Sequence, residues 1–588
     1  MCLSLQIKLL YIFAHSYSFI MPDKKLIQVE DLKISFLRQK QWFEVVKGIS
    51  FDINKGEIVG LVGESGSGKS VTSLAIMGIL PEKYSKINGG KITLYENQDD
   101  SIDLTSLKEK DYQSFRGNKI AMIFQEPMTA LNPVQKCGKQ IMEMILIHNK
   151  ISKTEAKQRV LELFKEVLLP DIERIYNSYP FELSGGQKQR VMIAMALSCN
   201  PDLLIADEPT TALDVTVQKT ILDLLKSIQI KYGIGILFIT HDLGVIKQIA
   251  DKVIVLYKGE IVEKGEVNDV FYNPKHSYTK GLLASRPPID IRPKRLLTVS
   301  DFLSNEVKTE ILITKEQRKE NHNLLYSQEP LLKVKDLSVE YVVEKTLFGK
   351  IKKKVIAVNK VSFDVFKGET LGLVGESGCG KTTIGRAILQ LIDSASGQII
   401  FEGKQLNEIK GEELRKIRKD IQIIFQDPYS SLNPRLTIGQ TIEEPLIVHN
   451  IFPNSKERKT RVISLLEKVG LDASQYDRYP HQFSGGQRQR IGIARSLALE
   501  PKIIICDESV SALDVSVQAQ VLNLLNDLKN DFGFTYIFIS HDLSVVKYMS
   551  DMMIVMQKGN IVEQGEADSI YANPQTQYTE KLISSIPV

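Results

Sequence analysis

Short apolar runs alternate with amphipathic stretches along the chain after residue 21. Runs such as 57–63 (EIVGLVG), 119–124 (KIAMIF), 202–207 (DLLIAD) and 235–240 (GILFIT) consist mostly of aliphatic residues. Strands that are apolar throughout are typical of a mainly parallel sheet covered by helices on both faces. Amphipathic stretches such as 153–169 predict the helices that lie between these strands. The pattern therefore predicts an α/β fold.

The same series of segments occurs twice. The segment LVGESGSGKS at 61–70 returns as LVGESGCGKT at 373–382, and LSGGQKQR at 183–190 returns as FSGGQRQR at 483–490. The offset is 312 residues for the first pair and 300 for the second, so the first copy has about a dozen extra residues between its motifs. We expect these residues in a longer surface hairpin or loop near 94–107, where polar and acidic residues gather.

A chain of 588 residues is too long for one hydrophobic core, which agrees with the repeat. The stretch 291–328 is polar and charged, as is typical of a linker. We predict an N-terminal extension over 1–21, a first domain over 22–271, a connecting segment over 272–329, a second domain over 330–570 and a C-terminal segment over 571–588.

The first twenty residues form the only long apolar run, but Lys8 and His15 interrupt it. It is marginal as a membrane span, which needs about 20 predominantly apolar residues. It also lacks the basic start of a signal peptide. We therefore expect translation to begin at Met21, where a polar domain entry starts, and we expect no membrane span elsewhere in the chain.

Composition excludes some kinds of partner and site. The chain has 43% hydrophobic and 25% charged residues, as soluble globular proteins do. A net charge of +4 is small for this length and predicts no nucleic-acid partner. The five cysteines form no CxxC pair, which excludes an obvious zinc or iron–sulfur site and fits a reducing compartment.

Both copies contain the pattern G-x-x-x-x-G-K-[ST] between an apolar run and a helical pattern. Glycines let backbone N–H groups surround phosphate oxygens, Lys69 and Lys381 add a positive charge, and Ser70 and Thr382 offer a hydroxyl to Mg²⁺. A glycine-rich turn without a ligand is the alternative, but two matches in the same context make chance negligible. The candidate phosphate-binding residues are Gly63, Glu64, Ser65, Gly66, Ser67, Gly68, Lys69 and Ser70 in the first copy and Gly375, Glu376, Ser377, Gly378, Cys379, Gly380, Lys381 and Thr382 in the second.

Two acidic residues end a later apolar run in each copy. We expect the aspartate to hold Mg²⁺ and the glutamate to polarise the attacking water of a phosphoryl transfer. A glutamine after one run suits contact with the metal and the water. A histidine after another run is more often structural, but its recurrence in both copies favours contact with the γ-phosphate. These candidates are Gln125, Asp207, Glu208 and His241 in the first copy and Gln426, Asp507, Glu508 and His541 in the second.

The two acidic segments differ at one position, since Ser509 stands where the first copy has Pro209. Proline fixes φ near −65° and has no N–H, and serine relaxes the first constraint and restores the donor. Every residue with a chemical role is retained in the second segment. We therefore expect both copies to be active, the second with a softer turn after its glutamate.

These motifs in this order resemble the ABC-type ATPases, in which LSGGQKQR and FSGGQRQR would be the signature sequences. The resemblance covers nearly the whole chain after Met21. It implies two tandem P-loop NTPase domains, each with a mainly parallel sheet flanked by helices, an antiparallel β part and a helical subdomain. It also implies that ATP and Mg²⁺ are the cofactors and that the two domains pair head to tail.

The resemblance assigns further residues to the two ATP sites. One site would pair Lys69 with the second signature and the other would pair Lys381 with the first; a helix that begins at the signature favours phosphate at its N-terminus. An aromatic before each phosphate loop would stack on adenine, although a core strand aromatic is the alternative. These candidates are Ser184, Gly185, Gly186, Gln187, Ser484, Gly485, Gly486, Gln487, Phe36 and Tyr341.

The chain is most similar to the ATPase subunits of oligopeptide and dipeptide importers. They share the Leu-Asn-Pro loop after the glutamine and the Asn-Pro-x-x-x-Tyr-Thr segments at 273–279 and 573–579. This resemblance implies two membrane permease subunits, which would dock on 126–182 and 427–482, an extracytoplasmic solute-binding protein and a location on the cytoplasmic face of a bacterial inner membrane. Many relatives bind an iron–sulfur centre after this segment, but the cysteines for it are missing here, so we expect none.

A soluble twin-cassette ATPase that acts on the ribosome is the alternative function. Such proteins tend to have a long basic helical connector, whereas the connector here has mixed charge. They also usually lack the histidine that both copies retain. The importer loops favour transport.

Overall fold

The computed structural model of the chain describes residues 24–38, 40–96, 100–211, 213–304, 311–345 and 351–586. The predicted N-terminal extension and the proposed start at Met21 lie outside these residues. Within the described ranges, no helix is both long and apolar enough to cross a membrane.

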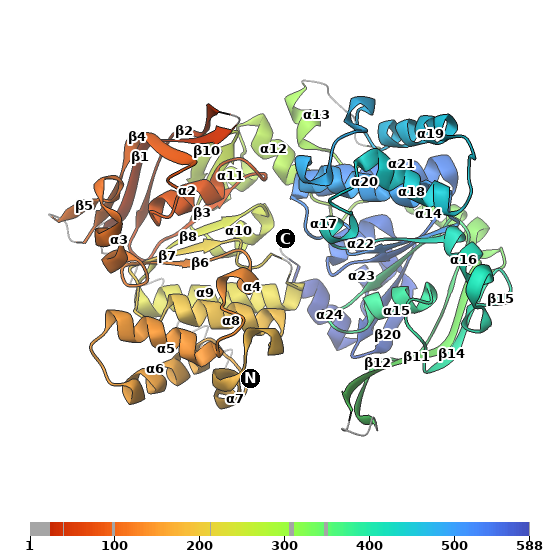
Figure 1. The fold of residues 1–588 in the computed structure, drawn as a ribbon, viewed down its shortest axis with the longest axis horizontal. Coiled ribbons are helices and arrows are strands. Elements are labelled where there is room, and N and C mark those ends of the chain that lie inside the picture. The colour runs from red at the N-terminus through yellow and green to blue at the C-terminus, as the bar shows by residue number, and fades with distance from the viewer. Residues whose placement is uncertain are drawn as a thin grey trace. The chain divides into compact units, whose positions relative to one another are not determined.

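The chain divides into two compact units. The first contains residues up to 211 together with 220–279, and the second contains 212–219 together with 280–588. The elements of the first repeat return in the same order in the second (Figure 1).

A six-stranded sheet forms the centre of each cassette, with the order β10-β9-β3-β8-β7-β6 in the first and the equivalent order in the second. The strands are β3 (Ile58–Val62), β6 (Ile120–Ile123), β7 (Leu203–Asp207), β8 (Gly235–Thr240), β9 (Lys252–Tyr257), β10 (Glu260–Glu266), β13 (Thr370–Val374), β16 (Ile421–Ile424), β17 (Ile503–Asp507), β18 (Thr535–Ile539), β19 (Met552–Gln557) and β20 (Asn560–Glu566). All pairs are parallel except β9–β10 and β19–β20. Every residue of β3, β7 and β8 is buried, which explains their apolar sequences.

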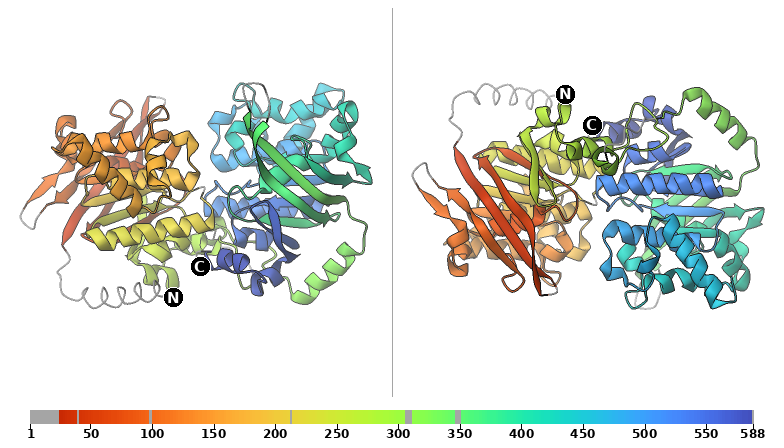
Figure 2. Two further views of the ribbon diagram at one scale, coloured as in Figure 1. Left: turned by 90° about the horizontal axis from the view of Figure 1, so that it is seen from below. Right: turned by 90° about the horizontal axis from the view of Figure 1, so that it is seen from above.

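A second, four-stranded antiparallel sheet forms a separate layer in each cassette (Figure 2). Its strands are β1 (Lys25–Arg38), β2 (Gln41–Asn54), β4 (Ser85–Tyr95), β5 (Ser101–Asp103), β11 (Leu332–Lys345), β12 (Ile351–Val365), β14 (Ser396–Phe401) and β15 (Lys404–Gln405). Five residues separate the paired Tyr95 and Ser101 of the β4–β5 hairpin, whereas two separate Phe401 and Lys404 of the β14–β15 hairpin, so part of the extra residues lengthens this hairpin, as predicted. Strand β4 is also longer than β14 at its start, where it pairs with β1. Buried side chains of both sheets, among them Ile34 and Ile205, share one hydrophobic core.

Helices complete the predicted α/β arrangement. Those of the first cassette are α2 (Lys69–Ile76), α3 (Glu109–Phe115), α4 (Pro127–Ala130), α5 (Cys137–His148), α6 (Lys153–Glu166), α7 (Ile172–Asn177), α8 (Gly185–Ala196), α9 (Val215–Tyr232), α10 (Leu243–Ile249), α11 (Val267–Tyr272) and α12 (Ser277–Ala284). Those of the second are α15 (Lys381–Ile388), α16 (Gly411–Asp420), α17 (Pro428–Ser431), α18 (Ile438–Val448), α19 (Ser455–Lys468), α20 (Gly485–Leu497), α21 (Val515–Phe532), α22 (Leu543–Met549), α23 (Ala567–Ala572) and α24 (Gln577–Ser584). Helix α6 confirms the prediction for 153–169 and buries Ala156, Val160 and Leu163, which share one face at helical spacing.

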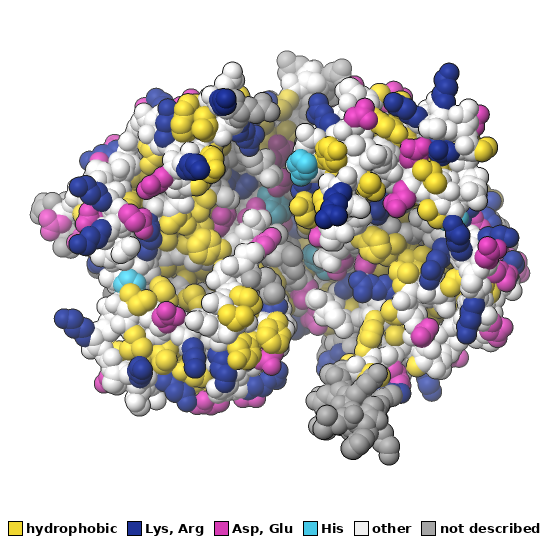
Figure 3. Space-filling model, in the orientation of Figure 1, with side chains coloured by type: hydrophobic (Ala, Val, Ile, Leu, Met, Phe, Trp, Pro, Cys, Tyr) yellow, Lys and Arg dark blue, Asp and Glu magenta, His cyan; other side chains and the backbone are white. Residues whose placement is uncertain are grey.

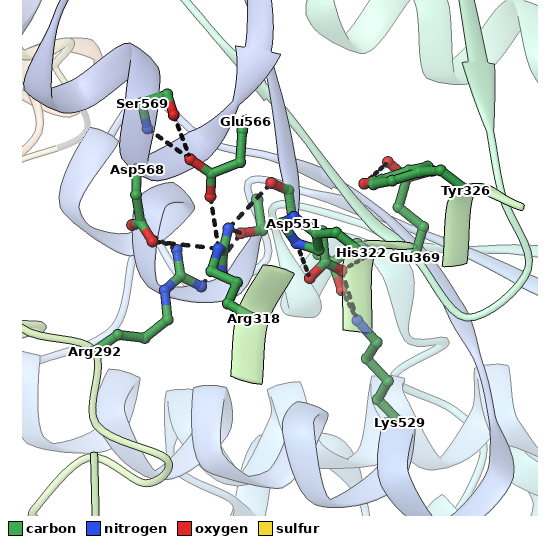
Figure 4. Close-up of polar contacts among 12 residues, drawn as sticks. Arg292, Arg318, His322, Tyr326, Glu369, Lys529, Asp551, Glu566, Asp568 and Ser569 are labelled. Carbon is green, nitrogen blue, oxygen red and sulfur yellow. Dashed lines mark hydrogen bonds and ion pairs between the residues drawn. The ribbon is translucent and has the colours of Figure 1, made fainter. Parts of the chain in front are cut away.

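The described parts of the stretch 291–328, residues 291–304 and 311–328, are more ordered than their linker-like composition indicates. They contain α13 (Val299–Leu303) and α14 (Lys315–Tyr326) and dock on the second cassette. The Arg318 guanidinium donates to a Glu566 carboxylate oxygen at 2.6 Å, and Arg292 pairs with Asp568 at 2.9 Å (Figure 4). A sequence shows such charges but not their partners, which is why the stretch resembled a solvated linker.

The two arginines also bind backbone carbonyls just after α22, the helix that follows His541. Arg318 donates to the carbonyls of Ser550 and Asp551 at 2.9 and 3.1 Å. Arg292 donates to that of Ser550 at 3.3 Å. Carbonyls at a helix end have no partner within the helix, so the guanidinium groups supply donors to the Ser550 carbonyl; the Asp551 carbonyl also accepts from the Ala567 N–H at 3.1 Å.

Asp551 connects this cluster to the strand before the phosphate loop. Its carboxylate accepts from the Thr370 N–H at 2.9 Å and pairs with Lys529 at 3.0 Å. Burial opposes the charge of Asp551, but Lys529, the hydrogen bonds from His322 and Thr370, and the Arg318 charge outweigh it and hold its pKa well below the ordinary value. These contacts therefore bind the described residues of the connecting stretch (291–328) to β13 and to the end of α22, the elements next to the residues of the second candidate site.

Replacement of Arg318 should destabilise the second cassette. Arg318→Ala removes the bonds to a partly buried Glu566 carboxylate oxygen and to the carbonyls of Ser550 and Asp551, so we expect it to lower the free energy of unfolding by about 3 kcal/mol. The matched control is Arg295→Ala in the same stretch. Its ion pair with Asp527 is exposed (61% and 51%), so we expect a loss under about 1 kcal/mol. Urea unfolding with hydrogen exchange of α22 measures both, and equal effects would contradict the assignment.

Candidate functional site

The phosphate loop of each cassette joins a central strand to a helix. The Lys69 amino group is buried and donates to the carbonyls of Gly63 and Glu64 at 2.7 and 3.0 Å. Lys381 makes the same two bonds, to Gly375 and Glu376, at the same distances. Each lysine therefore reaches back across its own loop from the first residue of α2 or α15.

Glycine is required at the start of each loop. Gly63 has φ 155° and Gly375 has φ 146°. A Cβ at Gly63 would lie 2.2 Å from the Leu256 carbonyl oxygen, and one at Gly375 would lie 2.2 Å from that of Met556. Any side chain would force the loop away from the neighbouring strand, so the loop closes only with glycine at this position.

The strand-end aspartate lies beside the hydroxyl that follows the lysine. Ser70 donates to Asp207 at 3.2 Å, and Thr382 donates to Asp507 at 2.7 Å. Burial raises the pKa of Asp207 to about 6 and moves that of Asp507 in the same direction. Each buried carboxylate and the hydroxyl beside it offer oxygen ligands, and a nearby cation would stabilise the charged form of the carboxylate.

The adjacent glutamate is held by two side chains from other strand ends. The Gln125 amide donates to Glu208 at 2.8 Å, and the His241 Nδ1 lies 3.2 Å from its other oxygen. Burial alone would raise the pKa of Glu208, but the hydrogen bond and charge of His241 and the charge of Lys69 outweigh burial and hold the pKa at about 2. Glu208 is therefore a carboxylate that accepts hydrogen bonds at neutral pH.

The second copy repeats this arrangement. Gln426 donates to Glu508 at 2.8 Å, and the His541 Nδ1 lies 3.5 Å from the same carboxylate oxygen. The pKa of Glu508 is also lowered, because the interaction with His541 and the Lys381 charge exceed the opposing effect of burial. These three side chains line a cavity of about 200 Å³ together with Lys381 and Thr382. The structure thus brings together the predicted lysine, hydroxyl, glutamine, acid pair and histidine in each copy.

The difference between Ser509 and Pro209 leaves the site geometry unchanged. The residues before them, Glu208 and Glu508, both have φ 47°. The N–H group of Glu208 donates to the carbonyl of Ile239 on the neighbouring strand β8, and that of Glu508 donates to the carbonyl of Ile539 on β18, both at 2.9 Å. The turn is therefore set by strand pairing, with or without the proline.

Each signature serine begins a helix. Ser184 is the N-cap of α8, where its hydroxyl accepts from the Gln187 N–H at 3.4 Å and its own N–H donates to the Gln187 side chain at 3.0 Å. Ser484 and Gln487 form the same capping box at α20. These glutamines, which the sequence suggested as nucleotide-binding residues, are used to start their own helices.

The two candidate adenine-stacking aromatics differ in exposure. Phe36 is half-buried against the core of its cassette, as the alternative interpretation expected, and Tyr341 is 40% exposed. Phe43 lies opposite Phe36 on the neighbouring strand and is 48% exposed.

Sequence reasoning missed a contact from each importer-type C-terminal segment. The Tyr278 hydroxyl accepts a hydrogen bond from the Glu64 N–H at 2.9 Å, and the Tyr578 hydroxyl accepts one from the Glu376 N–H at 3.1 Å. Both tyrosines belong to the Asn-Pro-x-x-x-Tyr-Thr pattern, which indicated the subfamily without indicating a role.

The chain was compared with solved structures. It is similar to an ATP-binding cassette dimer in a post-hydrolysis state with ADP and phosphate, at 28% identity over 40% of this chain and 98% of that one, with a TM-score of 0.36. It is also similar to cbiO1 from Clostridium perfringens, at 27% identity over 42% of this chain and 92% of that one, with a TM-score of 0.37.

Relatives match over nearly the whole length. The glutathione import ATP-binding protein GsiA of Escherichia coli (strain K12) is 47% identical over 96% of this chain and 90% of its own length. The protein of the same name from Pectobacterium atrosepticum is 45% identical over 97% of this chain and 90% of its own length. These matches favour the importer interpretation over the ribosomal alternative.

Family models assign both copies. The ABC transporter model matches residues 46–211 and 358–511, and the model of the oligopeptide/dipeptide transporter C-terminal region matches 262–307 and 562–588. These matches confirm the two ATP-binding α/β domains and the importer-type C-terminal segments that the sequence predicted. The chain belongs to the ABC transporter family, as a tandem-cassette ATPase that binds ATP and couples its hydrolysis to peptide transport.

Proposed function

We propose that this chain energises the import of glutathione or a peptide of similar size. The support is the match of both cassettes and both C-terminal segments to glutathione import ATP-binding proteins along nearly the whole chain. The transport path would lie in two membrane permease subunits that receive solute from an extracytoplasmic binding protein. The chain would work on the cytoplasmic face of the inner membrane.

Each phosphate loop would bind the phosphates of one ATP. The helix that follows the loop adds the N–H groups and the dipole of its N-terminus, and Lys69 or Lys381 adds a full charge. The two cassettes would pair head to tail, so that each nucleotide also meets the signature serine and glycines of the other copy. Nucleotide binding would then favour the closed pair, and hydrolysis would release it.

The residues beside each phosphate loop fit Mg²⁺. Ser70, Asp207 and Gln125 in the first copy, and their counterparts in the second, offer hydroxyl, carboxylate and amide oxygens. Mg²⁺ prefers oxygen ligands and usually takes one or two carboxylates together with substrate phosphates. The ion would neutralise charge on the phosphates.

Glu208 would position the attacking water. Its pKa of about 2 makes it a weak base, which suits a loose phosphoryl-transfer transition state that depends on positioning more than on early proton removal. Gln125 and His241 would fix the carboxylate and contact the water and the γ-phosphate. The observation that carries this assignment is the recurrence, in the second copy, of the glutamine hydrogen bond and the histidine contact to the glutamate, from Gln426 and His541 to Glu508.

Replacing both glutamates should stop turnover without stopping nucleotide binding. We expect Glu208→Gln with Glu508→Gln to lower ATPase activity by at least about 100-fold while ATP remains bound, because the amide keeps the shape but loses the charge that orients water. The single variants compare the two sites. If the second copy were catalytically inactive, Glu508→Gln would leave ATPase activity unchanged. Undiminished ATP hydrolysis in the double variant would reject the assignment of both glutamates.

Introducing the missing proline should leave the second site active. Ser509 is buried, and among the described residues its N–H donates to no partner, so proline removes no hydrogen bond there. We expect Ser509→Pro to keep ATPase activity within about twofold and to change the free energy of unfolding by at most about 1 kcal/mol. Pro209→Ser is the matched control. A large loss of activity would show that the softer turn is needed.

The solute assignment is tested with the complete importer in vesicles. We expect the binding protein loaded with glutathione to stimulate ATP hydrolysis and uptake of labelled glutathione, and the double glutamate variant to abolish both. Unrelated dipeptides serve as competitors. Stimulation by dipeptides without stimulation by glutathione would contradict glutathione as the solute while leaving peptide import in place.

A further inference from the structure

The peptide group between Gly63 and Glu64 is bound at both of its ends. Its carbonyl accepts from the Lys69 amino group at 2.7 Å, and its N–H donates to the Tyr278 hydroxyl at 2.9 Å. A trans peptide is planar with these two groups on opposite edges, so one bond constrains the orientation of the other. The hydroxyl therefore limits rotation of the peptide that orients the lysine.

The second copy contains the same arrangement with a different tyrosine. The carbonyl of Gly375 accepts from Lys381 at 2.7 Å, and the N–H of Glu376 donates to the Tyr578 hydroxyl at 3.1 Å. The two tyrosines occupy the same place in the Asn-Pro-x-x-x-Tyr-Thr pattern of the two C-terminal segments. Two independent copies with the same bond make a chance contact a poor explanation.

Each tyrosine is held by its surroundings. In the first copy, Glu263 on β10 accepts from the N–H groups of Lys275 and His276 at 2.8 and 3.1 Å, which anchors the turn before the tyrosine. The Tyr278 ring is fully buried, with its centroid 4.2 Å from that of Tyr257. A ring packed in this way loses little further freedom when its hydroxyl binds the loop.

The second tyrosine has a similar anchor and looser packing. Glu563 on β20 accepts from the N–H groups of Gln575 and Thr576 at 2.8 and 3.3 Å. Gln557 occupies the place of Tyr257, so Tyr578 has no aromatic partner there and is half-buried. The shared features are thus the carboxylate anchor and the hydroxyl bond to the loop.

We propose that Tyr278 and Tyr578 are positioning residues for ATP binding, through which each C-terminal segment holds its phosphate loop ready for the nucleotide. The hydroxyl acts on the loop backbone and does not touch the nucleotide. It keeps the first carbonyl of the loop directed at the lysine, so the ammonium is oriented before phosphate arrives. A loop that is already ordered binds with a smaller entropy cost.

This proposal rests on the proposed role of the loop and is tested with the full chain. Tyr278→Phe and Tyr578→Phe, singly and together, remove only the hydroxyl and keep the ring. We expect the double variant to raise the KM for ATP and the dissociation constant of a fluorescent ATP analogue about two- to tenfold. The kcat should stay within about twofold, because the residues around Glu208 and Glu508 are unchanged.

Tyr272→Phe is the matched control, since it removes an exposed hydroxyl (68% residue exposure) from the same segment. The proposal predicts no change in the KM for ATP in this control. It also predicts faster hydrogen exchange of amides 63–70 in Tyr278→Phe and unchanged exchange of these amides in the control. Should Tyr278→Phe fail to fold, the half-buried Tyr578 gives the same test at the second loop. Unchanged ATP affinity in folded tyrosine variants, or an equal loss in the control, would overturn the proposal.

Lys69→Ala with Lys381→Ala separates this proposal from the proposed ATP sites. Loss of ATP binding in the lysine variant with normal binding in the tyrosine variants would reject only the positioning role. Normal binding in the lysine variant would reject the ATP sites themselves, and the positioning role with them.

Discussion

Parallel pairing of the central strands is the constraint on which the rest of each cassette depends. The strands β3, β6, β7 and β8 run in the same direction, so their carboxyl ends meet at one edge of the sheet. The phosphate loop, Gln125, the acid pair and His241 each follow one of these strands. Ser70 and Asp207, which are 137 positions apart, therefore come within hydrogen-bond distance, and Glu208 gains Gln125 and His241 as partners.

The two cassettes share this catalytic edge and differ in what supports it. In the second cassette, Arg292 and Arg318 from the connecting stretch bind the carbonyls just after α22, and Asp551 ties them to the start of β13. The corresponding acidic position Asp568 is Asn268 in the first copy, and Lys529 is Gln229. The first copy therefore lacks two of the charges that the cluster uses, although Asp251 and Glu266 keep the acidic character of the positions equivalent to Asp551 and Glu566. Surface charges of both signs are interspersed on the face of each unit in Figure 3, in keeping with a small net charge.

Sequence reasoning succeeded where one local segment carries the chemistry. The phosphate loops, the acid pairs and helix α6 follow from spacing and periodicity, because strand, turn and helix signals are read over a few residues. It failed where a role depends on a distant partner. Arg318 looked like part of a solvated linker, and Tyr278 marked a subfamily without indicating its bond to Glu64.

The sequence by itself determined the duplicated α/β fold, the family and the residues of both candidate ATP sites. These properties rest on short patterns whose physical basis is local: apolar strands, glycines that admit positive φ, and acids at strand ends. Only the tertiary structure decided which of these residues are charged and which side chains from elsewhere in the chain hold the surrounding elements in place. The low pKa of Glu208 needs His241 and Lys69 beside it, and the order of the connecting stretch needs Glu566 and Asp568 opposite its arginines. Electrostatic energies depend on distance and burial, which the order of residues does not specify.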